Sequence, residues 1–454
     1  MSQHCGYVVT VKELRKHSNA DRLQVATFFN NDTIVDLSVS VGDKGIYFPS
    51  DLQLSVEFAE ANNLLRKKDE NGNNIGGYMD AEKRNVTAIR LRGEKSDGLY
   101  LPLTCLQSFG DITTLEDGDT IDVFNGHEIC TKYIPKHNPV RQREGGSRTR
   151  KKTVNIAPLF KEHADTEQLA YNLSAFKPGD EIEITLKLHG TSARTGYLPV
   201  LQKYKRSLLD RLLKREGKPV YKWGYVCGTR RVVIDTFDGG FYGSNEFRRA
   251  HHEKFIGRLE KGETVYYEIV GYVNESTPIM PRGKNEKLGR DFVKQYGKET
   301  TFSYGCEPGE SDIYVYRMTM TNEDGFVTEY SPDYMRYRCE QMGVKCVPML
   351  AKCVIDDEGA FIWKPTYLIG GAYAEEGSYG KSVMNLAEKF YDGADPIGKT
   401  HVREGVVCRI VNRPKFTAYK HKNFSFKVLE GIIKESADVP DMEEAQELTE
   451  VIDA

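Results

Sequence analysis

Residues 181–188 read Glu-Ile-Glu-Ile-Thr-Leu-Lys-Leu, with an apolar side chain at every second position. Successive side chains of a β-strand point to opposite faces, so this pattern predicts a strand with one buried face. Lys187 falls on the other face, away from the apolar layer. His189 and Gly190 follow, and the small residue would allow a phosphate or nucleotide to approach the backbone closely.

The chain has 454 residues, which is more than one core usually holds, and we expect two domains. Short strands separated by turn signals fill residues 1–135 and favour a small all-β barrel. Residues 136–153 are basic and contain Gly and Ser, which predicts a linker, acting either as a tether or as a phosphate contact. Strands and helices mix in 154–435, as in an α+β domain, and 436–454 form an acidic tail.

One stretch inside the second domain, residues 203–218, carries four leucines at helical spacing among mostly basic residues. This spacing predicts an amphipathic helix. The helix would either follow a nucleic-acid backbone or lie as a solvated helix on the core.

Net charge and cysteine content restrict the binding surfaces, the metal or disulfide sites and the cellular compartment that the protein can have. There are 63 Lys and Arg against 66 Asp and Glu, a net charge of -3, so any basic surface for nucleic acid must be local. The nine cysteines are scattered without a CxxC pair, which argues against a zinc site or a disulfide framework. No signal peptide or membrane span is evident, and we expect a cytoplasmic protein with no membrane partner.

Five further motifs follow the lysine strand in order. They are Gly228-Thr229-Arg230-Arg231, Tyr266-Tyr267-Glu268-Ile269-Val270-Gly271, Asp312-Ile313-Tyr314-Val315-Tyr316, Glu404-Gly405-Val406-Val407-Cys408-Arg409 and Tyr419-Lys420-His421-Lys422. Together with Lys187-Leu188-His189-Gly190-Thr191 they resemble the covalent nucleotidyltransferase superfamily of ligases and capping enzymes. The resemblance covers most of residues 180–430.

Details of the motifs favour RNA ligases within that superfamily. His189 stands where DNA ligases and capping enzymes usually carry Asp, and few residues follow the last motif, so their C-terminal OB domain is not expected. Residues 16–26 are similar to OB modules that bind tRNA. The resemblance therefore implies an α+β nucleotidyltransferase core preceded by an all-β OB-like barrel. Leu186 departs from the pattern, because phage-type RNA ligases often have Glu before the nucleophile.

The resemblance also implies a role for each motif. The protein would use ATP and Mg²⁺ or Mn²⁺, and Lys187 would form a covalent lysyl-AMP. A lysine must lose its proton before it attacks, and nearby cations favour that loss. The other implied roles are α-phosphate contacts for Lys420 and Lys422, metal binding for Glu404, ribose binding for Glu268, adenine stacking for Tyr316, 5′-phosphate binding for Arg230 or Arg231, and further nucleotide contacts for Leu188 and Gly190.

Three functions remain open at the level of sequence. The favoured one is an ATP-dependent RNA ligase that joins 3′-OH and 5′-phosphate ends of RNA or of an RNA-containing nicked duplex, through lysyl-AMP and an adenylylated 5′-end. The alternatives are a GTP-dependent capping guanylyltransferase and a non-catalytic RNA- or tRNA-binding protein. Tyr316 could instead be a cross-strand aromatic and Arg231 half of a surface ion pair. No protein partner is implied.

Overall fold

The computed structural model describes residues 4–72, 74–134, 156–207, 217–234, 236–238, 242–355, 361–363, 368–370 and 379–435. The predicted linker 136–153, the acidic tail 436–454 and positions 208–216 of the predicted amphipathic helix lie outside these ranges. The ends of that helix prediction are wrong, since strand β18 (Thr191–Lys205) runs into it and strand β19 (Lys218–Gly228) begins at its last residue. No helix among the described residues is long and apolar enough to span a membrane.

The chain divides into two compact units, and each unit is built from segments that are not contiguous in the sequence. The first unit contains the residues before the predicted linker together with residues 283–299 and 423–435. The second contains the described residues of 156–282 and 300–422. Sequence reasoning placed all of residues 154–435 in one domain, whereas here two of its segments belong with the N-terminal part.

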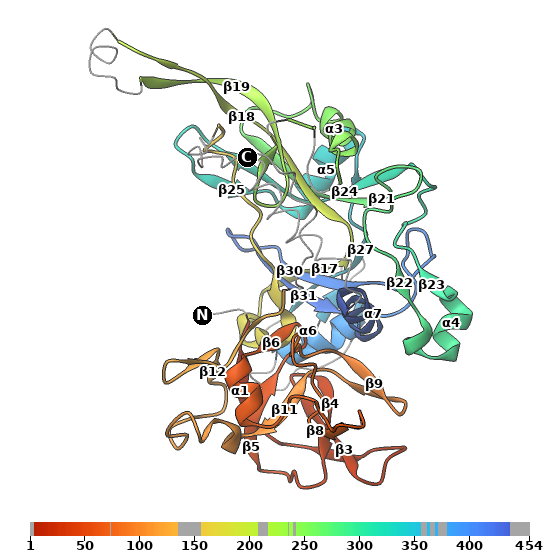
Figure 1. The fold of residues 1–454 in the computed structure, drawn as a ribbon. Helices are drawn as coiled ribbons and strands as arrows, with labels where there is room; N and C mark the ends of the chain where they lie inside the picture. The colour runs from red at the N-terminus through yellow and green to blue at the C-terminus, as the bar shows by residue number, and fades with distance from the viewer. Residues whose placement is uncertain are drawn as a thin grey trace. The chain divides into compact units, whose positions relative to one another are not determined.

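The first unit is built mainly from short antiparallel strands (Figure 1). They form a four-stranded sheet in the order β11-β5-β1-β12, a three-stranded sheet β2-β3-β4 and several two-stranded pairs. Among the strands described in residues 4–134, none of these sheets closes into a barrel, so the OB-like barrel stays a prediction. The elements are β1 (Gly6–Thr10), β2 (Leu14–Lys16), β3 (Leu23–Phe28), β4 (Asn31–Asp36), β5 (Lys44–Phe48), β6 (Leu52–Leu54), α1 (Val56–Ala61), β7 (Lys67–Lys68), β8 (Asn74–Gly76), β9 (Ile89–Leu91), β10 (Glu94–Ser96), β11 (Leu99–Pro102), β12 (Thr120–Ile121), β13 (Val123–Phe124), β14 (His127–Glu128), β15 (Cys130–Lys132), β22 (Gly283–Lys284), α4 (Arg290–Tyr296) and α7 (Phe424–Glu435).

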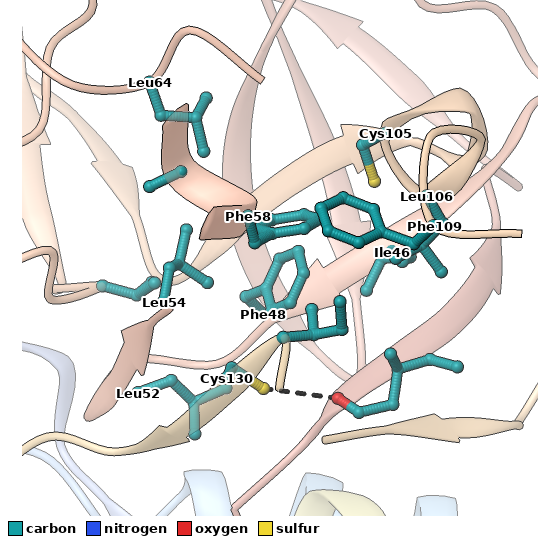
Figure 2. Packing of buried hydrophobic residues seen from close by; sticks show 14 of the residues in the cluster. Ile46, Phe48, Leu52, Leu54, Phe58, Leu64, Cys105, Leu106, Phe109 and Cys130 are labelled. Carbon is teal, nitrogen blue, oxygen red and sulfur yellow. Dashed lines mark hydrogen bonds between the residues drawn. The ribbon is translucent and has the colours of Figure 1, made fainter. Parts of the chain in front are cut away.

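An apolar core holds the first unit together. Phe48 and Phe58 lie at its centre with ring centroids 5.6 Å apart, and aliphatic side chains surround them (Figure 2). At its edge the Cys130 thiol donates a hydrogen bond of 3.3 Å to the Ile121 carbonyl. Burial of such large side chains is the main favourable term in the stability of a small β domain.

Helix α7 contributes to the same unit from the far end of the sequence. The amine of Lys427 lies 2.5 Å from a carboxylate oxygen of the buried Asp97. Side chains of α7 also pack on β22. A Cβ added to Gly283 of β22 would lie 2.9 Å from the Leu429 side chain of α7. These contacts explain why residues 423–435 belong with the first unit and not with the strand that precedes them.

The second unit contains two mixed sheets (Figure 1). The first sheet has seven strands in the order β16-β31-β30-β17-β27-β28-β29, and the second sheet has the order β20-β19-β18-β21-β24-β25 with β26 paired to β24. The mixture of strands and helices predicted for this region is confirmed. Its elements are β16 (Glu167–Gln168), β17 (Glu181–Lys187), β18, β19, β20 (Val233–Ile234), α3 (Glu246–Glu253), β21 (Glu263–Gly271), β24 (Ser311–Thr321), β25 (Val327–Glu329), α5 (Pro332–Met342), β26 (Lys345–Cys346), β27 (Met349–Ile355), β28 (Phe361–Trp363), β29 (Leu368–Gly370), α6 (Tyr379–Glu388), β30 (Gly405–Ile410) and β31 (Thr417–Lys422). Strand β23 (Glu299–Thr300) contains the sequence boundary between residues assigned to the first and to the second unit.

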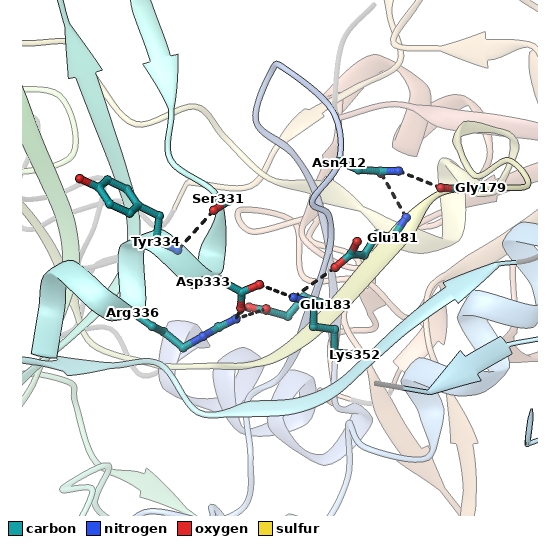
Figure 3. A network of polar contacts seen from close by, with 9 residues as sticks. All are labelled: Gly179, Glu181, Glu183, Ser331, Asp333, Tyr334, Arg336, Lys352 and Asn412. Carbon is teal, nitrogen blue, oxygen red and sulfur yellow. Dashed lines mark hydrogen bonds and ion pairs between the residues drawn. The ribbon is translucent and has the colours of Figure 1, made fainter. Parts of the chain in front are cut away.

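A polar network ties the lysine strand β17 to helix α5 (Figure 3). Arg336 of α5 forms two hydrogen bonds, of 2.9 and 2.7 Å, with the buried carboxylate of Glu183. Arg336 also contacts Asp333, and Lys352 of β27 bridges Asp333 to Glu181 at 2.7 and 3.1 Å. Because α5 contacts β24 and β26 of the second sheet, this network links the two sheets.

We predict that Arg336→Met destabilises the second unit by about 3 kcal/mol, because it leaves the Glu183 carboxylate buried without its partner. The measurement is the unfolding transition of the full chain in denaturant. Arg249→Ala is the matched control, since it removes an exposed arginine that contacts Glu246 and Glu253 at 3.0 and 3.7 Å. The control should cost less than about 0.5 kcal/mol. Equal effects of the two variants would contradict the structural role assigned to the Glu183 contact.

Candidate active site

The predicted lysine strand is confirmed, and Lys187 is the last residue of β17. Ile182, Ile184 and Leu186 are buried on one face of this strand. The next residue, Leu188, is buried as well. The Lys187 side chain is 22% exposed, so it is mostly shielded but still reaches the surface.

Lys187 is held by a carboxylate from a distant part of the sequence. Its Nζ donates to Oε1 of Glu404 at 2.6 Å. The Glu404 side chain is only 3% exposed, and its other oxygen, Oε2, is buried with no hydrogen-bond partner among the described residues. A buried carboxylate oxygen without a partner is costly, and a bound cation would offset that cost.

The register of the first sheet places two further lysines beside this pair. Lys187 lies across from Gly405, which lies across from Lys422 of β31, and Val407 lies across from Lys420. Paired residues of neighbouring strands point to the same face, so Lys187, Lys420 and Lys422 share one side of the sheet. His421 lies between the two β31 lysines in sequence and is buried against Tyr391 on the other side.

Two glycines of the motifs are required by backbone packing. A Cβ on Gly405, whose φ is +148°, would lie 2.1 Å from the His421 carbonyl oxygen. A Cβ on Gly190 would lie 2.3 Å from the Ile269 carbonyl oxygen and 2.9 Å from Cγ of Glu268. From the sequence we expected a nucleotide to approach the backbone closely at Gly190. In the structure it is the backbone of strand β21 that packs against the Cα of Gly190.

The second sheet contributes Glu268 and Tyr316. Glu268 lies on β21, which is buried along its whole length, and it pairs across the sheet with Ser192 and Tyr314. Tyr316 is the extra residue of a β-bulge in β24, and its hydroxyl lies 2.9 Å from the Ser192 hydroxyl. The bulge directs Tyr316 toward the side that Ser192 and Glu268 share.

A histidine that the sequence did not reveal connects the two sheets. The His163 ring lies 4.9 Å from the Tyr316 ring and 5.4 Å from the Phe416 ring, both with T-shaped geometry. The guanidinium groups of Arg317 and Arg409 lie over Phe416 at 4.8 and 4.9 Å. The side of the first sheet that carries Arg409 and Lys187 therefore faces the side of the second sheet that carries Arg317 and Tyr316.

Burial and the nearby arginines hold the pKa of His163 well below its usual value. Its imidazole is therefore neutral, and Nδ1 accepts a hydrogen bond of 3.3 Å from Arg317. His163 lies outside all the ordered motifs, between the predicted linker and β16, and no local pattern marks it.

Arg230 and Arg231 meet at one carboxylate. Arg230 forms an ion pair with Asp165, and Arg231 lies 3.5 Å from the other oxygen of the same residue. The buried Arg194 donates to the carbonyls of Thr229 and Arg231 at 2.9 and 3.0 Å, which fixes the turn that carries them. The surface ion pair considered for Arg231 is thus present.

The described residues contain no group of three or more His, Cys, Asp or Glu side chains placed to hold a metal.

Comparison with solved structures identifies the fold. The chain matches the RNA ligase of Naegleria gruberi as a lysine mutant with ATP and Mn, at a TM-score of 0.51 and 14% identity over 93% of this chain and 98% of that chain. An apo mutant of the same ligase gives a TM-score of 0.53 at 15% identity, over 94% and 98%, and the ligase with PPi gives 0.51 at 16%, over 93% and 97%. The chain therefore has the fold of these Naegleria gruberi structures. No protein-family profile and no curated protein sequence matches the chain.

We predict that Gly405→Ala lowers the stability of the second unit, because its Cβ would collide with the β31 backbone and displace Glu404 and Lys422. Overpacking of this kind costs about 1–3 kcal/mol or more. Gly224→Ala on β19 is the control, since its nearest contact would be an ordinary 3.4 Å. Thermal unfolding of both variants measures the difference. A Gly405→Ala protein that behaves like the control would contradict the packing.

Proposed function

We propose that this protein is an ATP-dependent RNA ligase that joins 3′-OH and 5′-phosphate ends through lysyl-AMP on Lys187. The observation that carries the proposal is the 2.6 Å contact between Lys187 Nζ and Glu404, on a sheet face that also holds Lys420 and Lys422. The fold supports it, and the similar Naegleria structures contain ATP, AMP or PPi.

In the first step Lys187 loses a proton and its Nζ attacks the α-phosphorus of ATP. A phosphorus–nitrogen bond forms and the bond to the pyrophosphate oxygen breaks. Negative charge accumulates on the phosphate oxygens in the transition state, and Lys420 and Lys422 are placed on the same face to stabilise it. The Glu404 contact orients the amine before attack.

Glu404 would hold a divalent cation, Mg²⁺ or Mn²⁺. The donor is suitable, because carboxylate oxygens are preferred ligands of these ions and Oε2 is buried without a partner among the described residues. When bound, the cation would supply positive charge next to the reacting phosphate. The Naegleria ligase structures with ATP contain Mn, which is consistent with this assignment.

The remaining motif residues would bind nucleotide and RNA. Tyr316 would stack on adenine and Glu268 would accept a hydrogen bond from a ribose hydroxyl. Arg230 or Arg231 would bind the 5′-phosphate, in place of or beside Asp165. Leu188 and Gly190 would line the nucleotide through their backbone, since the Leu188 side chain is buried.

The later steps return Lys187 to its free state. An oxygen of the RNA 5′-phosphate attacks the lysyl-AMP phosphorus, the phosphorus–nitrogen bond breaks, and an adenylylated 5′-end forms. The 3′-OH then attacks the 5′-phosphorus and AMP leaves. The substrate would be RNA or an RNA-containing nicked duplex, bound in part by an OB-like N-terminal module, in RNA repair or nick sealing in the cytoplasm.

We predict that the wild-type chain, incubated with labelled ATP and a divalent cation, retains label after denaturing electrophoresis. Lys187→Ala should retain none, while still joining a chemically pre-adenylylated RNA end, because the amine takes part only before that stage. Lys67→Ala is a control, since it removes an exposed lysine of the first unit whose amine contacts the Asn63 side chain at 3.3 Å. Label from GTP alone would indicate a capping enzyme, and full labelling of Lys187→Ala would refute the assignment.

A further inference from the structure

Tyr304 contacts the backbone immediately after Lys187. Its hydroxyl oxygen accepts a hydrogen bond of 2.7 Å from the His189 backbone N–H. Tyr304 is 4% exposed, and burial keeps its pKa well above the usual value, so the hydroxyl remains neutral. The hydrogen bond anchors the turn by which the chain passes from Lys187 at the end of β17 into β18.

The same segment contacts the chain that leads to Glu404. The Tyr304 ring lies 4.5 Å from the ring of the fully buried His401, with the planes at 81°. The Phe302 ring contacts both histidines, with its centroid 4.7 Å from the His189 ring and 5.2 Å from the His401 ring. Residues 302–304 thus touch the backbone beside the nucleophile and the segment beside its carboxylate partner.

The segment before Glu404 is itself a rigid support. The Asp395 carboxylate accepts hydrogen bonds from the backbone N–H groups of Ile397, Gly398 and Lys399 at 3.0, 2.7 and 2.9 Å. Gly398 packs directly on the tyrosine segment, since a Cβ there would lie 2.4 Å from the Gly305 backbone nitrogen. A shift of residues 302–305 would therefore be transmitted to this turn.

The backbone of Tyr304 is strained. Its φ is +52°, in the left-handed region that non-glycine residues with large side chains rarely adopt. Such strain persists where surrounding contacts fix the conformation, and it clusters at functional sites. In this conformation the hydroxyl contacts the His189 N–H and the ring lies against His401.

We infer that Tyr304 is a positioning residue for lysine adenylylation: by binding the His189 N–H and packing on His401, it fixes Lys187 relative to Glu404. This inference rests on the proposed ligase function and assigns a residue outside the ordered motifs to it. Tyr304 does not take part in bond making. Its effect acts through the placement of the Lys187 amine, and is therefore expected in kcat of lysyl-AMP formation and not in KM for ATP.

The test compares Tyr304→Phe with Tyr242→Phe in the full chain. The first variant keeps the ring and loses the acceptor of the His189 N–H. The second also loses one hydrogen bond to the backbone, 2.9 Å to the Ile279 carbonyl, but lies outside the motifs. We expect Tyr304→Phe to lower kcat of labelling by ATP about tenfold, with KM for ATP within about twofold, while Tyr242→Phe changes neither.

Hydrogen exchange gives a second readout that does not depend on turnover. Peptides that contain His189 should exchange faster in Tyr304→Phe and at the wild-type rate in Tyr242→Phe. An unchanged kcat, or a loss that appears in KM alone, would overturn the role of Tyr304. If the wild-type chain itself takes no label from ATP, the ligase proposal fails first, and with it the positioning role.

Discussion

The contact between the Lys187 amine and the Glu404 carboxylate joins segments more than two hundred residues apart, and the second unit is arranged to maintain it. A shielded lysine beside a buried carboxylate is stable only when both are held in place. The pairing of β17, β30 and β31 holds them from the sheet side. Residues 302–305 hold the turns on which each segment depends.

In the proposed function, the two sheets would divide the chemistry between them. The first sheet presents positive charge, from Lys187, Lys420 and Lys422, next to the Glu404 carboxylate. The second presents an aromatic ring and a carboxylate, Tyr316 and Glu268, suited to a base and a sugar. His163 and the arginines around Phe416 lie where the sheets meet and keep these faces opposite each other. A nucleotide bound across both faces would bring its α-phosphate toward Lys187.

Local pattern was enough to predict the strand of Lys187 and the mixed character of its domain, whereas the candidate site residues on the two sheets were named from the family resemblance. It failed where contacts are distant in sequence. Nothing in the local pattern marks His163 or Tyr304, because their roles arise only when strands from separate motifs meet. The same holds for α7, which follows Lys422 directly yet packs with Asp97 in the first unit. The ion pair of Glu183 could not be predicted either, because its partner Arg336 is 153 residues away in the sequence.

If Lys187 is the covalent nucleophile, the nucleotide must be attached to its side chain, and locating the adduct decides the question. The full chain would be incubated with ATP and Mn²⁺, digested, and mapped by mass spectrometry for a peptide that carries one AMP. We predict AMP on the Lys187 side chain through an acid-labile phosphorus–nitrogen bond. An adduct on another residue, or a GMP adduct from GTP with none from ATP, would contradict it.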